Sequence, residues 1–121
     1  MVYSAIKTPD GTVLVSRSVH DYKQHVDKNG KTYVIDGGLE YIRSSVNGDE
    51  KYIVYTLDDA HDIVRDLVKW GTYGKKGDQP LKYVSVAEMT TEHIEAVLEN
   101  CNIHPNLKIV FERELNYRLS A

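Results

Sequence analysis

The segment 69–83, KWGTYGKKGDQPLKY, combines residue types that bind phosphate groups or stack on bases. It holds three of the chain's eight glycines, four lysines, the only tryptophan and two tyrosines. A nucleotide P-loop needs Gly, four residues and then Gly-Lys-Ser/Thr, because that spacing wraps backbone N–H groups around the phosphates and places a hydroxyl on magnesium. Here Gly71 and Gly74 are three residues apart and Lys75 is followed by Lys76. The spacing and the missing hydroxyl rule out a P-loop.

The same segment does not fit a dinucleotide-binding fingerprint either, since it follows a predicted helix and no βαβ unit surrounds it. Two interpretations remain. It is a solvated connection or hinge between two elements, or it is a binding loop in which Trp70 and Tyr73 offer stacking area. In the second interpretation an anionic partner is attracted by the lysines of the segment, Lys69, Lys75, Lys76 and Lys82.

A second candidate site lies in the predicted strand LEYIRSS, where Arg43 shares a face with Leu39 and Tyr41. This would place a tyrosine and an arginine together on the sheet, where either could join the segment 69–83 in holding a nucleotide. The alternative, which we favour, is an arginine whose aliphatic stem lies along the rim of the sheet.

Cys101 and His104, in CNIH, could meet at a helix end as nucleophile and base. A buried cysteine is the favoured interpretation, because Cys101 continues an apolar helical stripe. The histidines do not suggest a metal site: His20 and His25 fall on opposite faces of one predicted strand, and the others are scattered. No pattern for a cofactor is present.

These residues are positioned by a first half that resembles an antiparallel meander. Short segments rich in Val, Ile, Thr and Tyr alternate with turn sequences that tolerate positive φ, such as PDG, KNG and NGD. The predicted hairpins pair 2–7 with 12–16, 20–27 with 31–36, and 39–46 with 51–57. Because the segment 51–57 is apolar on both parities, we expect it to be a central strand covered on both faces.

From Asp58 the period changes to that of a helix. Asp58 and Asp59 suit its start, and Gly71 suits the position just past its end. A connection at 71–80 and a short extended segment at 81–86 follow.

Two more helices close the chain. The first is capped by Thr90 or Thr91 and preceded by a single turn at 85–88, where Ser85 and Glu88 have capping-box spacing. The second has Pro105 in its first turn and extends to about residue 119. Its inward residues are predicted to be Leu107, Val110, Phe111 and Leu115.

The composition fits one α+β domain spanning residues 1–121, with an antiparallel meander of about five or six strands packed by about three helices from the C-terminal half. Apolar residues make up 41% and charged residues 27%, as in a soluble protein without a membrane span. The start lacks a secretory signal, and a single cysteine excludes an internal disulfide, so we expect a cytoplasmic location. The net charge is −3, and the basic stretch 65–83 is too small for a nonspecific nucleic-acid binder.

Several phrases carry a family resemblance: HDY at 20–22, YVIDGGLEYIR at 33–43, WGTYGKKGDQPLKYV at 70–84, MTTEHIEAVLE at 89–99 and RELNYR at 113–118. Together they resemble a family of small bacteriophage-encoded proteins of uncharacterised function, with a WGTxGKxGxQPLxYV segment, a following M…HI helix and a terminal ELEYR. The similarity extends from about residue 18 onward, and Asn116 departs from it. The resemblance implies an accessory protein that acts in the cytoplasm of an infected bacterium.

The leading functional expectation is therefore a noncatalytic phage protein that binds a host or phage macromolecule and modulates host machinery or defence. The favoured kind of macromolecule is a protein. A nucleotide-binding or sequestering protein, or contact with nucleic acid, is the alternative, and a small hydrolase a weaker one. The residues expected to bind are Trp70, Tyr73, Lys75, Lys76 and Lys82, with Arg43 and Tyr41.

Overall fold

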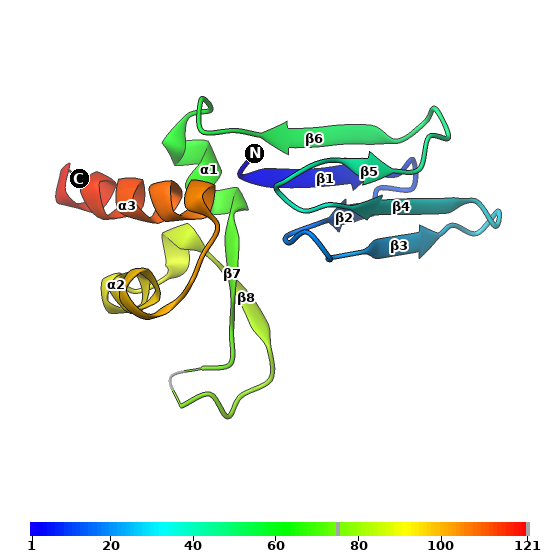
Figure 1. Cartoon of the computed structure of the whole chain (residues 1–121). Coiled ribbons are helices and arrows are strands. Elements are labelled where there is room, and N and C mark those ends of the chain that lie inside the picture. Colours follow the sequence, from blue (N-terminus) through cyan, green and yellow to red (C-terminus); the bar gives the residue numbers. More distant parts are fainter. Residues whose placement is uncertain (75, 121) are drawn as a thin grey trace. The chain divides into compact units, whose positions relative to one another are not determined.

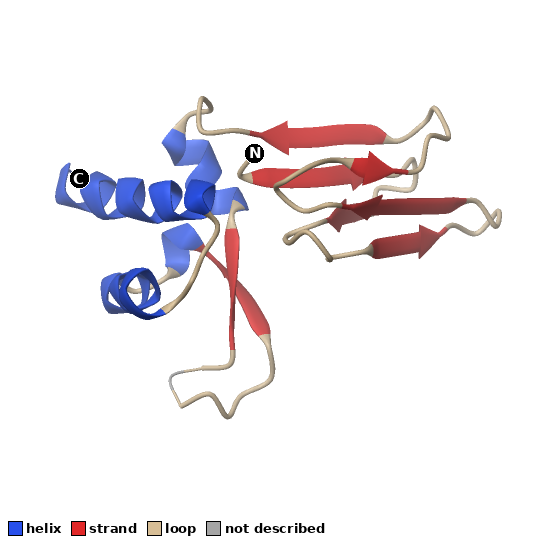
Figure 2. Cartoon of the chain, in the orientation of Figure 1, coloured by secondary structure: helices blue, strands red, loops and turns tan. Residues whose placement is uncertain are grey.

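The structure is a computed structural model that describes residues 1–74 and 76–120. The chain forms two compact units, Met1–Thr56 and Leu57–Ala121. Every helix among the described residues belongs to the second unit, while the first is built of strands (Figure 2). The three sheets that the described residues form are all antiparallel. The predicted α+β class, with strands concentrated in the first half and helices in the second, is confirmed.

Two three-stranded sheets make up the first unit (Figure 1). One has the order β2-β1-β6 and the other the order β3-β4-β5. The strands are β1 (Tyr3–Lys7), β2 (Val13–Val15), β3 (Lys23–Val26), β4 (Thr32–Asp36), β5 (Arg43–Ser44) and β6 (Lys51–Tyr55). The predicted pairings of β1 with β2 and of β3 with β4 are confirmed.

The third predicted hairpin is wrong, because β5 pairs with β4 whereas β6 pairs with β1. The reason lies in the turn between them. The carboxylate of Glu50 accepts the backbone N–H groups of Asn47 and Gly48, each at 2.8 Å, and this local turn leads the chain from one sheet to the other. Consequently β6 is an edge strand with Tyr52 and Val54 exposed, not the central strand that its apolar sequence predicts.

The core of the first unit joins both sheets. Ile6 and Leu14 from the first sheet and Tyr33 and Ile35 from the second form one buried cluster. The phenol of Tyr33 donates to the carboxylate of Asp49 at 3.0–3.1 Å, so the only polar atom of this ring is satisfied. In β1 the neighbours Ser4 and Ala5 are buried as well as Ile6, so this central strand is covered on both faces.

After β4 the chain turns through a pair of glycines that no other residue can replace without distortion. Gly38 has φ +57°, and its N–H donates to Ser16 Oγ at 2.9 Å. A Cβ at this position would lie 2.3 Å from the carbonyl carbon of Ser18. This tight turn replaces the start of the strand predicted at 39–46, and only Arg43–Ser44 remains extended.

The second unit has the order α1 (His61–Leu67), β7 (Lys69–Thr72), β8 (Lys82–Ser85), a 3-10 turn η1 (Val86–Glu88), α2 (Thr91–Asn100) and α3 (Pro105–Ser120). Strands β7 and β8 form a two-stranded hairpin that leads away from α1 and α3 (Figure 1). The cap at Thr90, whose side chain accepts the N–H of His93 at 3.1 Å, is confirmed. The turn at 85–88 and the start of α3 at Pro105 are also confirmed.

The first predicted helix is longer than the observed one. The observed helix α1 begins after Ala60, and Ala60 occupies the N-cap position without a side-chain hydrogen bond. The prediction that Asp58 or Asp59 caps this helix is therefore wrong. It ends at Leu67, and Gly71 lies inside β7 instead of stopping the helix. β-Branched and aromatic residues favour strands, and pairing with β8 provides the partner that a sequence window does not show.

Cys101 is the other correction among the helices. It is exposed and sits just past the end of α2 with extended backbone, φ −109° and ψ 142°. The helix stops at Asn100, so its apolar stripe ends with Leu98, which is partly buried. Cys101 is not part of this stripe, and the prediction that it is buried is wrong.

A buried carboxylate holds the second unit together. Glu114 of α3 is 0% exposed. Arg65 of α1 binds it through two hydrogen bonds of 2.8 Å, and Arg118 donates from Nε at 2.7 Å. His61 Nε2 lies 3.0 Å from Oε1 of the same carboxylate. Arg118 also donates to the carbonyl of Met89 at 2.6 Å, which ties α3 to the segment after β8.

A side chain at position 38 should destabilise the first unit. We expect Gly38→Ala to lower the free energy of unfolding by roughly 2 kcal/mol or more, because the new methyl group meets the backbone of Ser18. Gly30→Ala is the matched control: φ is +81°, with no atom within 4 Å of the added Cβ, so it costs about 1 kcal/mol. Urea unfolding followed by circular dichroism compares the two. Equal losses would contradict the steric account.

Glu114→Gln should lower the free energy of unfolding by about 3 kcal/mol near neutral pH, since both arginines lose their counter-charge. Burial raises the pKa of Glu114, but hydrogen bonds from Arg65, Arg118 and His61 outweigh it and hold the pKa at about 2, below the ordinary 4.5. Its contribution is therefore complete above the ordinary pKa and lost as the pH falls from there through 2. Urea unfolding across this range should show the difference from wild type vanish in acid. Glu112→Gln, exposed on α3, is the control, and a pH-independent difference would refute the assignment.

Candidate functional site

The β7–β8 hairpin contains the segment that the sequence singles out. Its register pairs Trp70 with Val84 and Gly71 with Tyr83. Alternation places Trp70 and Val84 on one face. The Trp70 ring lies edge-on to Phe111 of α3, with centroids 5.5 Å apart and an interplanar angle of 70°. The indole is thus partly buried and packs the hairpin on α3 instead of standing free.

The opposite face of the hairpin is open. Leu81 and Tyr83 flank Gly71 so closely that an added Cβ would lie 3.1 Å from Leu81 Cδ1 and 3.2 Å from Tyr83 Cε1. Leu81 is nevertheless 47% exposed and Tyr83 42% exposed, while Tyr73 at the end of β7 is 56% exposed. Lys69 shares the parity of Gly71 and therefore this face.

We call these side chains, with the exposed lysines beside them, the hairpin surface. It consists of Lys69, Tyr73, Leu81 and Tyr83 on the open face, Lys76 of the loop, and Lys82, which lies next to Leu81 and Tyr83 in β8 but has the parity of Trp70. The structure brings the predicted Tyr73, Lys76 and Lys82 into one hairpin. Lys75, which the sequence also proposes, lies outside the described residues. Leu81 and Tyr83 were missed as site residues, and the alternation in LKYV, with its lysine between two apolar side chains, is the signal that could have found them.

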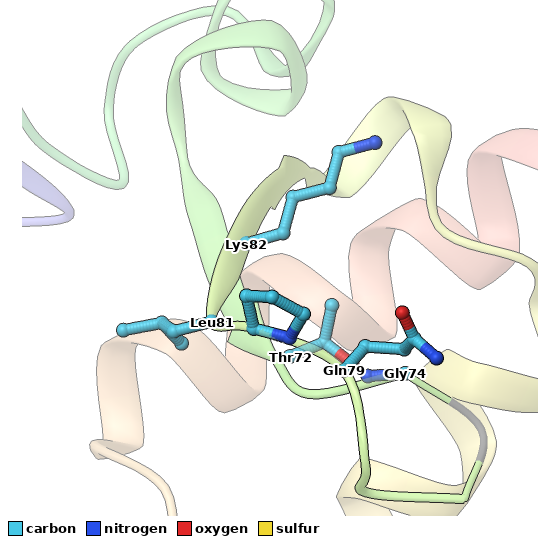
Figure 3. A pocket seen from close by; sticks show the side chains of 6 residues that line it. Thr72, Gly74, Gln79, Leu81 and Lys82 are labelled. Carbon is cyan, nitrogen blue, oxygen red and sulfur yellow. Dashed lines mark hydrogen bonds between the residues drawn. The ribbon is translucent and has the colours of Figure 1, made fainter.

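An open depression of about 390 Å³ lies at the loop of the hairpin, and Figure 3 shows the side chains that line it. It is lined by Thr72, Gly74, Gln79, Pro80, Leu81 and Lys82. Two backbone bonds close this loop: Gln79 N–H donates to the Tyr73 carbonyl at 2.8 Å, and Gly77 N–H to the Gly74 carbonyl at 3.1 Å. Leu81 and Lys82 point to opposite sides, as successive strand residues do (Figure 3).

Tyr41 and Arg43 belong to the first unit, whereas the hairpin surface belongs to the second. The Arg43 guanidinium pairs with the carboxylate of Asp36. The backbone N–H of Gly37, at 2.8 Å, and this guanidinium hold the pKa of Asp36 below its ordinary value. The ring of Tyr41 covers Gly37, where a Cβ would lie 2.7 Å from Cδ2. Arg43 therefore neutralises a buried carboxylate, although its own side chain is 72% exposed.

The side-chain clusters that could suggest catalysis have structural explanations. His104 Nδ1 accepts the N–H of Asn106 at 3.1 Å at the start of α3, where it serves as a cap. His25 contacts both Asp10, at 2.8 Å, and Thr12, at 3.4 Å, through the same atom, Nε2. A hydrolytic triad needs the acid and the nucleophile on different ring nitrogens.

Within the described residues, no group of three or more His, Cys, Asp or Glu side chains is arranged to hold a metal ion. The buried carboxylate of Glu114 is bound by two guanidinium groups and an imidazole, so it has a structural role in holding α1 and α3 together. Helices of the length and hydropathy needed to cross a membrane are absent from residues 1–74 and 76–120.

Trp70 and Tyr73 should differ sharply in their effect on stability. We expect Trp70→Ala to lower the free energy of unfolding by about 2 kcal/mol, since it removes the packing on Phe111, and Tyr73→Ala to change it by less than about 0.5 kcal/mol. Urea unfolding followed by circular dichroism measures both variants. If Tyr73→Ala is the costlier change, the two rings have been assigned to the wrong faces.

Comparison of the chain with known protein families, with curated proteins and with solved structures finds no match. The functional argument therefore starts from the hairpin itself. It presents exposed apolar side chains with exposed lysines near them.

Proposed function

We propose that this chain is a noncatalytic binding protein that recognises a protein partner through the hairpin surface. The main observation in its support is that the side chains of Leu81 and Tyr83 pack beside Gly71 on the open face of the hairpin and are both still exposed. Tyr73 adds a third exposed apolar side chain beside them. Neighbouring exposed apolar groups mark interaction sites more often than scattered ones, and tyrosine is common among the anchors of interfaces.

The charge of the hairpin indicates an acidic partner. Three described lysines, Lys69, Lys76 and Lys82, are exposed there, and Asp78 is the acid among them. The whole chain carries a net charge of −3, so this positive area stands out locally. Lysines at the edge of an apolar contact speed the encounter with an acidic surface and oppose contact with a basic one.

A protein partner has more support than a nucleotide. The depression at the hairpin loop has a volume within the range of small-ligand sites, roughly 300–1,000 Å³. Among its described lining residues, however, Lys82 is the sole cation, and phosphate groups in proteins are usually held by several converging donors. The apolar anchors lie beside this depression on an open face, which suits a broad contact with a macromolecule.

The resemblance to phage-encoded proteins supports a setting for this activity. In that setting the chain acts in the cytoplasm of an infected bacterium, and the partner is a host or phage protein whose machinery or defence role it modulates. The absence of a catalytic role is part of the proposal, and it is supported by the structural use of the clusters around His104, His25 and Glu114.

Affinity capture tests the proposed function. The immobilised chain is incubated with bacterial lysate, and retained proteins are quantified by mass spectrometry. Lys76→Glu/Lys82→Glu should reduce the captured partner by roughly tenfold or more, because it reverses the positive charge of the hairpin, which attracts an acidic surface. Lys28→Glu/Lys51→Glu is the matched control, with the same charge change on exposed lysines of the first unit, and should retain it. The proposal fails if wild type captures nothing above the blank resin, or if both double variants capture equally.

A further inference from the structure

One edge of the hairpin presents backbone groups that no strand among the described residues uses. Val86 N–H donates to the Val68 carbonyl at 2.9 Å, so these opposite residues form a hydrogen-bonded pair. In an antiparallel ladder such pairs alternate with pairs that are not bonded to each other. The register then makes Trp70–Val84 a bonded pair and leaves Gly71 among the unbonded ones.

The same alternation puts Lys69 opposite Ser85 in an unbonded pair. The N–H and C=O groups of Lys69 and Gly71 therefore point away from β8, along the outer edge of β7. The described part of this sheet contains only β7 and β8, so β7 has no second neighbour there. An unpaired strand edge is a template for the addition of another strand.

The side chains next to this edge favour an incoming strand. Leu81 and Tyr83 reach across the hairpin and cover the α-carbon of Gly71, which offers no side chain of its own. A residue added opposite Gly71 would rest its side chain against Leu81 and Tyr83. Such cross-strand contacts, especially an aromatic ring over a glycine, stabilise sheet pairing.

We propose that β7 accepts an extended, acidic segment of the partner as a third strand of this sheet. This inference rests on the proposed function and specifies its mode. Lys69 lies on the face shared with Tyr83, and Lys76 is exposed in the loop that follows β7, so an acidic incoming strand would meet opposite charge along this edge. A second copy of the chain fits less well, because it would bring a second set of the same lysines into one sheet.

The test uses a random dodecapeptide display library selected on the full-length chain. We expect enriched peptides in which acidic residues alternate with β-branched or aromatic ones. The tightest of them, added to the isotopically labelled chain, should slow hydrogen exchange at the Gly71 amide by roughly tenfold or more. The Trp70 amide is the internal control, because its ladder bond to Val84 exists before binding.

Backbone methylation of the selected peptide provides a readout independent of the folding of any variant. N-methyl groups at alternate residues along one edge of the peptide should weaken binding by roughly a hundredfold, and along the other edge should leave it nearly unchanged, since only one edge faces β7. Strand addition is refuted if no acidic peptide is enriched, if both methylated forms bind alike, or if the Gly71 amide stays unprotected. If the Gly71 amide is protected from exchange without peptide and sedimentation shows dimers, a second copy of the chain, and not an acidic segment, is the added strand.

The two proposals can fail separately. If lysate capture depends on Lys76 and Lys82 but the Gly71 amide of the complex exchanges as in the free chain, recognition stands and strand addition falls. If peptides protect Gly71 while lysate capture ignores the hairpin lysines, strand addition stands and the proposed cellular role falls.

Discussion

The second unit depends on the neutralisation of one carboxylate that has no access to water. Glu114 lies on α3 among residues that form the core, where an uncompensated charge would cost several kcal/mol. Two guanidinium groups, from Arg65 and Arg118, bind its two oxygens, and the ring of Tyr117 lies 4.5 Å from the Arg65 guanidinium. The arrangement is demanding in geometry, so it fixes the position of α1 against α3.

This constraint reaches the hairpin because its partners flank both strands. Arg65 belongs to α1, which ends immediately before β7. Arg118 donates to the carbonyls of Val86 and Met89, in the segment immediately after β8. One buried carboxylate thus secures the start and the end of the hairpin, and Trp70 packs its inner face on α3. Because the hairpin is held in this way, the apolar side chains on its opposite face stay exposed.

Local signals in the sequence were sufficient where a single turn or cap decides the structure. The turns at PDG and KNG produced the expected hairpins, and Thr90 and Pro105 mark the helix starts. Pairing between distant segments was not accessible in this way: β6 joins β1 across the whole first unit, and β7 finds its partner only after the loop. Glu114 was missed because a polar residue in a helix is ordinarily solvated, and its buried position follows from arginines on two elements.

The candidate site follows the same division. Composition identified the hairpin segment, including Tyr73, Lys76 and Lys82, because glycine, lysine and aromatic residues cluster there. It could not tell which aromatic side chain packs inward, since that depends on the pairing of Trp70 with Val84 and on contact with Phe111. It also gave Leu81 and Tyr83 no special weight, although the register brings them to either side of Gly71.

Securing the hairpin at both ends has a thermodynamic consequence for any molecule that binds it. A flexible loop loses conformational entropy when it is captured, and that loss subtracts from the affinity. Here the ion network around Glu114 has already restricted the two strands during folding. A partner that binds a preorganised strand loses mainly its own conformational entropy, so a contact of few residues keeps more of its affinity.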